Sequence, residues 1–163
     1  MQVKVKKLHR NAKLPVLGSK AAAGADLYAC LEYDLMTIAC HQTVKIPTGI
    51  AVEIPDGYFG AVFARSGLAT KSGLRPANCV GVIDSDYRGE VMVALHNDTD
   101  YNQTVMNGER VAQIVILPCV YVEYCESDKL SETDRGAGGF GSTGETEVRK
   151  KKRNNSVPEY GEW

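Results

Sequence analysis

The sequence has few cysteines, and they follow no known ligand or disulfide pattern. It has five, an odd number, and no two are spaced as C-x-x-C. A disulfide framework or a structural zinc site is therefore not expected, and the thiols are predicted to be reduced and packed as small apolar side chains. The cysteines are Cys30, Cys40, Cys79, Cys119 and Cys125.

Long apolar runs are also absent. The residues after Met1 are largely polar and basic where a secretory signal needs an apolar stretch. No run approaches the roughly 20 apolar residues of a membrane span. The net charge is −1, so the total charge by itself favours neither an anionic nor a cationic partner. We expect a cytoplasmic protein that does not bind membranes.

Short segments of strand character dominate the 163 residues, which are enough for one domain with a real core. Ile50, Val52 and Ile54 alternate with other residues at the period of a β-strand, and turn signals such as Pro55-Asp56-Gly57 recur. The pattern predicts an all-β sandwich or barrel with one short helix at 66–72, where Ser66 could be the N-cap. Further strands are expected at residues 3–8, 58–64, 111–116 and 120–124.

The last thirty or so residues differ in composition. Residues 135–144 contain five glycines, and residues 145–163 are polar and charged. We predict a β domain at 1–134, a flexible glycine-rich arm at 135–144 and a disordered tail at 145–163. The basic run at 149–153 is interpreted as a solvated part of that tail, which makes a nucleic-acid partner unlikely but leaves one open.

The arm could contact a nucleotide. It matches G-x-G-x-x-G literally, but no βαβ unit surrounds it, so a dinucleotide fold is excluded. Its unhindered backbone N–H groups, Arg135, and the hydroxyls of Ser142 and Thr143 suit a polyphosphate, and Phe140 offers a face to a base. The alternative is a plain flexible linker.

Residues 81–90 have the features of a β-hairpin whose tip carries chemistry. Two apolar residues, two acids, a tyrosine and an arginine lie between two glycines, with strand-like runs on both sides. Asp84 and Asp86 would share one face of a strand, so the residues alone do not separate them as candidate bases. The alternative is a solvated turn rich in aspartate.

Residues in three further segments have two interpretations each. Arg65 and Ser66, at the start of the expected helix, could extend an anion site, although Ser66 could simply cap the helix. Asp26 could contact a metal or could be an ordinary turn residue. Gln113 could bind a ligand or could be an outward-facing residue on a strand.

Five segments in order resemble the motifs of the trimeric dUTP pyrophosphatases (dUTPases). They span about residues 15–144, so the resemblance covers nearly the whole domain. Ala64 departs from the family, in which many members have proline, and the tail at 145–163 is outside the resemblance. The segments are Ala23-Gly24-Ala25-Asp26-Leu27, Arg65-Ser66-Gly67-Leu68-Ala69, Gly81 to Glu90, Gly108-Glu109-Arg110-Val111-Ala112-Gln113, and Arg135 to Gly144.

The resemblance implies a jelly-roll-like subunit in a homotrimer, with three active sites built from more than one chain. It implies hydrolysis of dUTP to dUMP and pyrophosphate with Mg²⁺, which limits uracil in DNA and supplies dUMP for dTTP synthesis. Asp84 would activate the water that attacks the α-phosphorus, and Asp26 would contact Mg²⁺ through water. Asp86 would have a supporting role.

The resemblance also implies a set of substrate contacts. Tyr87 would exclude a 2′-hydroxyl, and the arm would close over the site. The uracil would be read by Asn78, Val82 and Ile83, with Met92 on the apolar side. The phosphates would be bound by Arg65, Ser66, Gly67 and Gln113. The arm would contribute Arg135, Phe140, Gly141, Ser142 and Thr143.

Two other functions are compatible with such a chain. One is a dCTP deaminase-related enzyme on the same fold, against which Tyr87 near Asp84 and the Phe140 arm both argue. The other is a nucleotide-sensing regulatory module, which the presence of Asp84 and of the arm makes less favourable.

Overall fold

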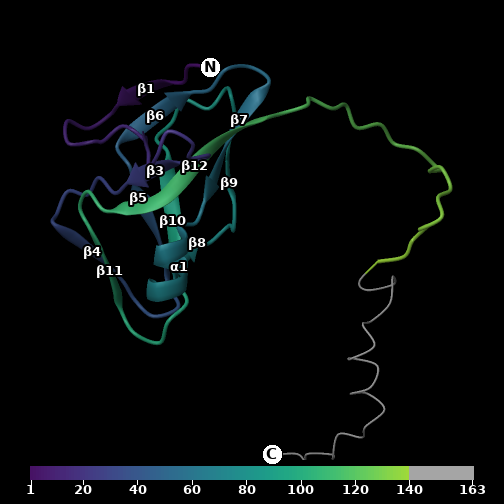
Figure 1. Ribbon diagram of the computed structural model, residues 1–163. Coiled ribbons are helices and arrows are strands. Elements are labelled where there is room, and N and C mark those ends of the chain that lie inside the picture. The colour runs from purple at the N-terminus through teal and green to yellow at the C-terminus, as the bar shows by residue number, and fades with distance from the viewer. Residues whose placement is uncertain (140–163) are drawn as a thin grey trace, which may run out of the picture. The chain divides into compact units, whose positions relative to one another are not determined.

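The computed structural model describes residues 1–139, which contain twelve β-strands and one short helix (Figure 1). The prediction of an all-β protein with one short helix is confirmed. The elements are β1 (Lys4–Lys7), β2 (Val16–Leu17), β3 (Ala25–Tyr28), β4 (Leu35–Ile38), β5 (Thr43–Pro47), β6 (Ile50–Glu53), β7 (Tyr58–Phe63), α1 (Ser66–Ser72), β8 (Leu74–Pro76), β9 (Gly81–Ile83), β10 (Met92–Asn97), β11 (Gln103–Met106) and β12 (Arg110–Pro118).

The strands pair antiparallel in a jelly-roll-like arrangement, as expected. The largest sheet has the order β2-β3-β12-β7-β9, and a second sheet has the order β5-β10-β8. Two further pairs are β1-β6 and β11-β4. The long strand β12 lies between β3 and β7 (Figure 1), so segments distant in sequence meet in its neighbourhood.

Apolar side chains from most strands form one core. Four of these side chains, each from a different strand, are completely buried. They are Ile38 of β4, Ile46 of β5, Leu95 of β10 and Val111 of β12. Burying each such side chain contributes about 1.5–3 kcal/mol to the free energy of unfolding. The alternation predicted from Ile50 onward is confirmed in part, because Ala51 between the buried residues is buried as well.

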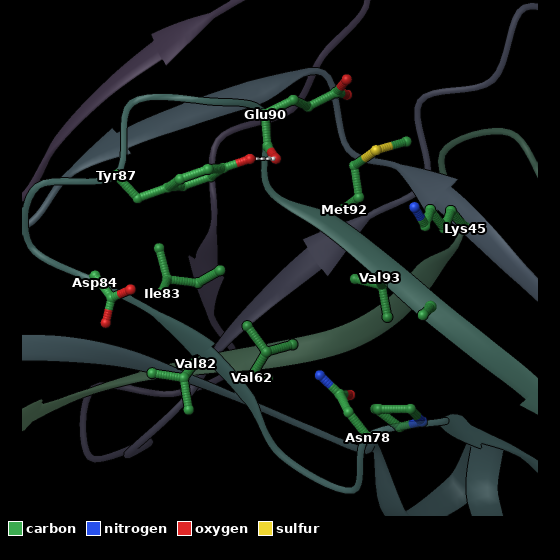
Figure 2. A pocket seen from close by; sticks show the side chains of 13 residues that line it. Lys45, Val62, Asn78, Val82, Ile83, Asp84, Tyr87, Glu90, Met92 and Val93 are labelled. Atoms are coloured by element: carbon green, nitrogen blue, oxygen red, sulfur yellow. Dashed lines mark hydrogen bonds between the residues drawn. The ribbon is translucent and has the colours of Figure 1, made fainter.

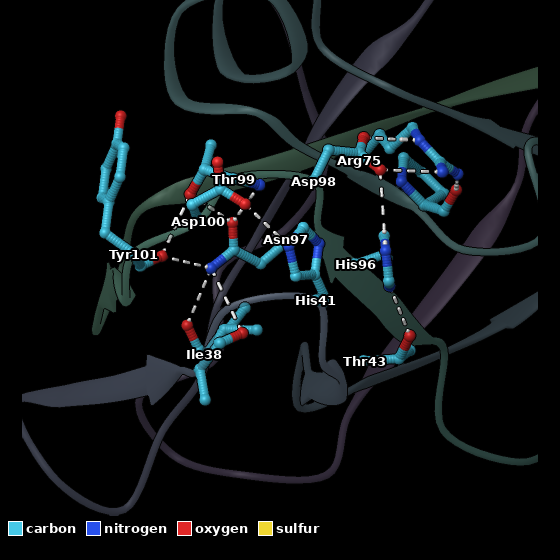
Figure 3. A network of polar contacts seen from close by, with 12 residues as sticks. Ile38, His41, Thr43, Arg75, His96, Asn97, Asp98, Thr99, Asp100 and Tyr101 are labelled. Carbon is cyan, nitrogen blue, oxygen red and sulfur yellow. Dashed lines mark hydrogen bonds and ion pairs between the residues drawn. The ribbon is translucent and has the colours of Figure 1, made fainter. Parts of the chain in front are cut away.

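A buried amide holds one end of this core together. The Asn97 side chain is inaccessible to solvent, and its Nδ2 donates to the carbonyls of Ile38 (3.1 Å) and Tyr101 (2.8 Å) (Figure 3). Its Oδ1 accepts from Thr99 N at 2.9 Å. The next residue, Asp98, donates its N–H to Gly73 O, so this network also fixes the end of α1. Buried polar groups need such partners.

The predicted hairpin at residues 81–90 is wrong. β9 pairs with β7 in the five-stranded sheet, whereas β10 pairs with β5 and β8 in the other sheet. The segment at 84–91 therefore passes from one sheet to the other. Asp84 and Asp86 lie in this turn and not on a strand, so the two-residue spacing does not place them on one strand face.

Two smaller predictions are also wrong. Arg65 occupies the N-cap position of α1, and no side chain makes a capping hydrogen bond, so Ser66 begins the helix without capping it. Residues 120–124 form no strand, because within residues 1–139 this segment pairs with no other strand. Val120 and Tyr124 are 83% and 93% exposed.

The chain divides into two units, the first Met1–Val122 and the second from Glu123 onward. The first contains every strand and the helix described above. The boundaries predicted at 134 and 144 remain a prediction. In residues 1–139, none of the helical segments has the length and apolar character needed to cross a bilayer.

Candidate active site

A cavity of about 340 Å³ opens between β9, the 84–91 turn and β10 (Figure 2). This volume lies within the range of small-molecule sites. The structure brings six of the predicted substrate residues to its wall, from three separate segments. They are Asn78, Val82, Ile83, Asp84, Tyr87 and Met92.

Other residues of the wall could not be identified from the sequence. Lys45 reaches the cavity because β5 pairs with β10, with Lys45 opposite Ala94. Nothing in the local sequence around Lys45 indicates that pairing. Gly81 also lines the cavity, and a Cβ there would lie 3.1 Å from Val62 Cβ, so the close approach of β9 to β7 favours glycine. The other unpredicted lining residues are Val62, Pro76, Glu90, Val93 and Ala94.

Strand β9, whose residues line this cavity, is an edge strand. It is the last strand in the order β2-β3-β12-β7-β9, and within residues 1–139 no strand pairs with its second edge. An edge strand carries a row of N–H and C=O groups that can pair with another molecule. The backbone around Val82 is therefore available to hydrogen-bond a planar polar ligand.

The ring of Tyr87 has a fixed position at the cavity. Its hydroxyl donates to the carbonyl of Glu90 at 3.0 Å, as Figure 2 shows. Gly89 lies against the ring, and a Cβ there would overlap the Tyr87 hydroxyl, so glycine at this position leaves room for the ring where it lies. The Glu90 carboxylate in turn accepts from Gly49 N at 2.6 Å. The turn thus holds the hydroxyl end of the ring, and Gly49 in turn anchors Glu90.

The structure distinguishes the two acids that the sequence left equivalent. Asp84 lines the cavity that contains Tyr87 and Asn78, whereas Asp86 does not. Both acids border a second hollow on another side of the turn, together with Ser85 and Tyr121. Asp84 is therefore the acid that can reach a ligand in the main cavity.

A second group of predicted residues surrounds Asp26. The Asp26 carboxylate accepts from Arg65 Nε at 2.9 Å and from Arg110 Nη1 at 3.2 Å. Arg65 also donates through Nη1 to the carbonyl of Arg110 at 3.1 Å. We call Asp26, Arg65 and Arg110 the Asp26 cluster. It fixes the guanidinium of Arg65 beside the start of α1, where Ser66 and Gly67 are exposed.

Gln113 is held beside this cluster and is not a fully outward-facing residue. It is half-buried on β12, and its Nε2 donates to Ala64 O at 3.0 Å. A Cβ at Gly24 would lie 2.9 Å from Gln113 Oε1, so glycine at that position leaves room for the amide. The segments around Gly24, Ala64 and Gln113, which the sequence places far apart, therefore meet here.

The two groups of predicted residues do not meet in a single chain. Arg65, Ser66, Gly67 and Gln113 do not line the main cavity. Arg135 belongs to the second unit, where its Nε donates to Gly138 O at 2.8 Å. The remaining predicted arm residues lie outside the described residues. They are Phe140, Gly141, Ser142 and Thr143.

The predicted Mg²⁺ has few side-chain ligands available in the described part of the chain. In the described part of the chain, no three His, Cys, Asp or Glu side chains converge as a metal-binding group. Both oxygens of the Asp26 carboxylate already contact a guanidinium, but each oxygen has a second lone pair that can accept a hydrogen bond from water. These residues fit an ion that arrives on the ligand and reaches Asp26 through water.

Comparisons with known proteins agree with this geometry. The family model described as dUTPase matches residues 10–144. The deoxyuridine 5'-triphosphate nucleotidohydrolase of Desulfitobacterium hafniense is 56% identical over 133 residues, 81% of this chain and 87% of that protein. The enzyme of the same name from Hydrogenobaculum sp. is 46% identical over 144 residues, 88% of this chain and 99% of that protein.

A solved structure is also similar. The G164S mutant of the Staphylococcus bacteriophage 80alpha dUTPase with dUpNHpp has a TM-score of 0.79 and 29% identity, covering 88% of this chain and 98% of that one. The family match extends over strands β2 to β12, the main cavity and the Asp26 cluster. From residue 10 to residue 144, therefore, this chain belongs to the dUTPase family.

Proposed function

We propose that the protein is a dUTP diphosphatase, which hydrolyses dUTP to dUMP and pyrophosphate. The observation that carries the proposal is the placement of Asp84, Tyr87 and the β9 edge around one cavity. An acid, a fixed aromatic ring and a row of backbone hydrogen-bonding groups are what recognition and hydrolysis of a deoxyuridine nucleotide require. The names of the relatives, given above, support the same activity.

The β9 edge and Asn78 would recognise the uracil. Along its pairing edge uracil presents an acceptor (O4), a donor (N3–H) and an acceptor (O2), whereas cytosine presents a donor (N4–H), an acceptor (N3) and an acceptor (O2), so the first two groups are reversed. Backbone groups of Val82 and Ile83 fixed for uracil would leave unpaired buried groups against cytosine, which discriminates strongly. The close packing of Gly81 on Val62 keeps this edge rigid. Met92 would contribute an apolar side to the pocket.

Tyr87 would select deoxyribose. Its hydroxyl is held by the Glu90 carbonyl, so the ring cannot easily turn away from a ligand in the cavity. A ring packed on the flat 2′ side of deoxyribose leaves no room for a 2′-hydroxyl. UTP would then be rejected by steric overlap, without any hydrogen bond being needed to detect the sugar.

Asp84 would act as the general base. Water is a weak nucleophile, and a positioned carboxylate that accepts its proton makes the attack on the α-phosphorus easier. The water oxygen would bond to the α-phosphorus while the bond to the bridging oxygen breaks, which releases pyrophosphate and leaves dUMP. The proton would pass to the Asp84 carboxylate and from there to solvent.

The phosphates would be bound by Arg65, Ser66, Gly67 and Gln113, with Asp26 holding Arg65 in place. A Cβ at Gly67 would meet no atom of residues 1–139 within 4 Å, so a phosphate can approach the backbone there. Mg²⁺ on the triphosphate would neutralise negative charge on the phosphate oxygens. Arg135, Phe140, Gly141, Ser142 and Thr143 of the arm would complete the contacts.

A homotrimer would unite the two groups of residues. On one chain, the cavity with Asp84 and the Asp26 cluster with Gln113 are separate. A triphosphate whose base occupies the cavity needs cations along its phosphates, and another copy of the chain would supply them. Sites shared between subunits would account for residues of one reaction lying at two places on one chain.

The test is pyrophosphate release from dUTP compared with UTP, dTTP and dCTP. We expect turnover of dUTP alone. Release of ammonia from dCTP would instead identify a deaminase, and equal turnover of UTP would refute the role given to Tyr87. Sedimentation of the same preparation reports the oligomeric state, and a monomer with full activity would refute the shared site.

A further inference from the structure

We propose that Tyr121 is a positioning residue for the turn that carries Asp84. The inference rests on the proposed function, because positioning matters only if Asp84 is the base. Tyr121 lies beyond the end of β12, within the first unit, Met1–Val122. Its side chain is 64% exposed, so apolar burial alone does not explain where it lies.

The Tyr121 hydroxyl joins three segments. It donates to Asp56 Oδ1 at 2.7 Å and accepts from Gly57 N at 3.3 Å, both in the turn between β6 and β7. The Ser85 hydroxyl lies 3.2 Å from the same oxygen. A phenol hydroxyl has one hydrogen, and Tyr121 donates it in the hydrogen bond to Asp56, so Ser85 is the donor to Tyr121.

Ser85 follows Asp84 directly, and a second residue restrains it. Arg88 Nη1 donates to the Ser85 carbonyl at 2.6 Å, and Tyr87 N donates to the Asp84 carbonyl at 3.2 Å. The side chain of Ser85 is thus held by Tyr121, while its carbonyl is held by Arg88. Together these bonds fix the backbone on the C-terminal side of Asp84.

The Asp84 carboxylate itself depends on this backbone. Among the described residues it accepts no hydrogen bond, which leaves both oxygens available to water but also leaves nothing to orient them directly. Its direction is therefore set by the turn. Displacements of about 1 Å in catalytic geometry can lower rates about a hundredfold, so a restraint on this turn affects catalysis.

The segment that carries Tyr121 is itself attached to the body of the domain. Cys119 N donates to Gly57 O at 2.8 Å, so the chain leaving β12 is bound to the same turn that Tyr121 reaches. Asp56, Tyr121 and Cys119 line the second hollow, which the turn residues Asp84, Ser85 and Asp86 also border. The catalytic turn is therefore supported by the residues that line the second hollow.

The experiment compares Tyr121→Phe, Ser85→Ala and the double variant in the full chain. Losing the hydrogen bond between Ser85 and Tyr121, which both substitutions remove, should lower kcat on dUTP by about twofold to tenfold, with KM unchanged. The double variant should be no slower than the slower single variant, because both remove the same contact. Amide hydrogen exchange in residues 84–90 should be faster in Tyr121→Phe, with the exchange of β12 unchanged.

Tyr101→Phe is the matched control. Tyr101 is 63% exposed, and its hydroxyl makes no hydrogen bond within residues 1–139. The kcat of Tyr101→Phe should therefore equal that of the unsubstituted chain. Three results would each overturn the proposal. They are a wild-type kcat in Tyr121→Phe, losses of kcat in Tyr121→Phe and Ser85→Ala that add fully in the double variant, and unchanged amide hydrogen exchange in residues 84–90. Failure of the unsubstituted chain to hydrolyse dUTP refutes the proposed function instead, and the exchange comparison still reports on the contact.

Discussion

Replacing Asp26 with asparagine separates the two roles that this residue could have. In the structure, the carboxylate accepts from Arg65 Nε at 2.9 Å and from Arg110 Nη1 at 3.2 Å. The Asp26 side chain is only 15% exposed and that of Arg65 27%, whereas that of Arg110 is 52% exposed. Asparagine keeps the shape of the side chain but removes the charge and one acceptor oxygen.

The expected loss follows from this geometry. A hydrogen bond between charged groups contributes about 1.5–3 kcal/mol when it is shielded from water, and the half-exposed Arg110 contributes less. We expect Asp26→Asn to weaken the placement of Arg65 by about 2 kcal/mol. At about 1.4 kcal/mol per factor of ten, this lowers kcat/KM for dUTP by about 30-fold.

The assay is pyrophosphate release over a range of dUTP and Mg²⁺ concentrations. If Asp26 acts by holding Arg65, the loss is the same at every Mg²⁺ concentration, and Arg65→Gln added to Asp26→Asn costs little more. If Asp26 acts mainly through water on Mg²⁺, raising the Mg²⁺ concentration restores activity. An unchanged kcat/KM at all Mg²⁺ concentrations would refute both roles.

Three further predictions concern selectivity and stability. Tyr87→Ala should admit UTP and so reduce the preference for dUTP over UTP by at least about tenfold, as measured by pyrophosphate release. An unchanged preference would mean that the ring does not select the sugar. Gly73→Ala should lower the free energy of unfolding by about 1–3 kcal/mol in a denaturant titration. The reason is that Gly73 has φ 63° and that a Cβ there would lie 2.5 Å from Thr99 Cγ2. An unchanged free energy of unfolding would contradict this prediction. Burial, with a smaller effect of Glu90, raises the pKa of the Cys30 thiol above 9.0, so the unfolded chain loses this proton first. Stability from this group is present below about pH 9 and is lost as the pH rises through the folded pKa, and Cys30→Ala should therefore show a smaller fall in stability between about pH 8 and pH 10.

The sequence was sufficient for some of the local elements. The alternation at 50–54 and the turn at Pro55-Asp56-Gly57 predicted β6 and the turn after it, and the expected helix at 66–72 has the bounds Ser66–Ser72. These features depend on residues close together in the chain. Their propensities and periodicity are therefore visible without knowledge of the tertiary fold.

The pairing of strands could not be read in the same way. Two extended runs on either side of a turn favour a hairpin locally, but β9 instead pairs with β7, with Val82 opposite Ala61, and β10 pairs with β5. That choice depends on contacts between distant segments. For the same reason the sequence did not identify Lys45 as a lining residue, and it left Asp84 and Asp86 equivalent.

The segment after β12 shows a different limit. The alternation of Val120, Tyr121 and Val122 resembles a strand, but the side chains are exposed and no strand forms. The hydroxyl of Tyr121 instead reaches Asp56 and Ser85. Hydrogen bonds of this kind join residues far apart in sequence, and a pattern of apolar residues cannot indicate them.

The central claim is that Asp84, and not Asp86, activates the attacking water. The most direct measurement is kcat on dUTP for Asp84→Asn and Asp86→Asn side by side. Because Asp84 lines the main cavity and Asp86 does not, we predict a loss of about 10²- to 10⁴-fold in Asp84→Asn and less than about tenfold in Asp86→Asn. Full activity in Asp84→Asn, or the larger loss in Asp86→Asn, would contradict this account.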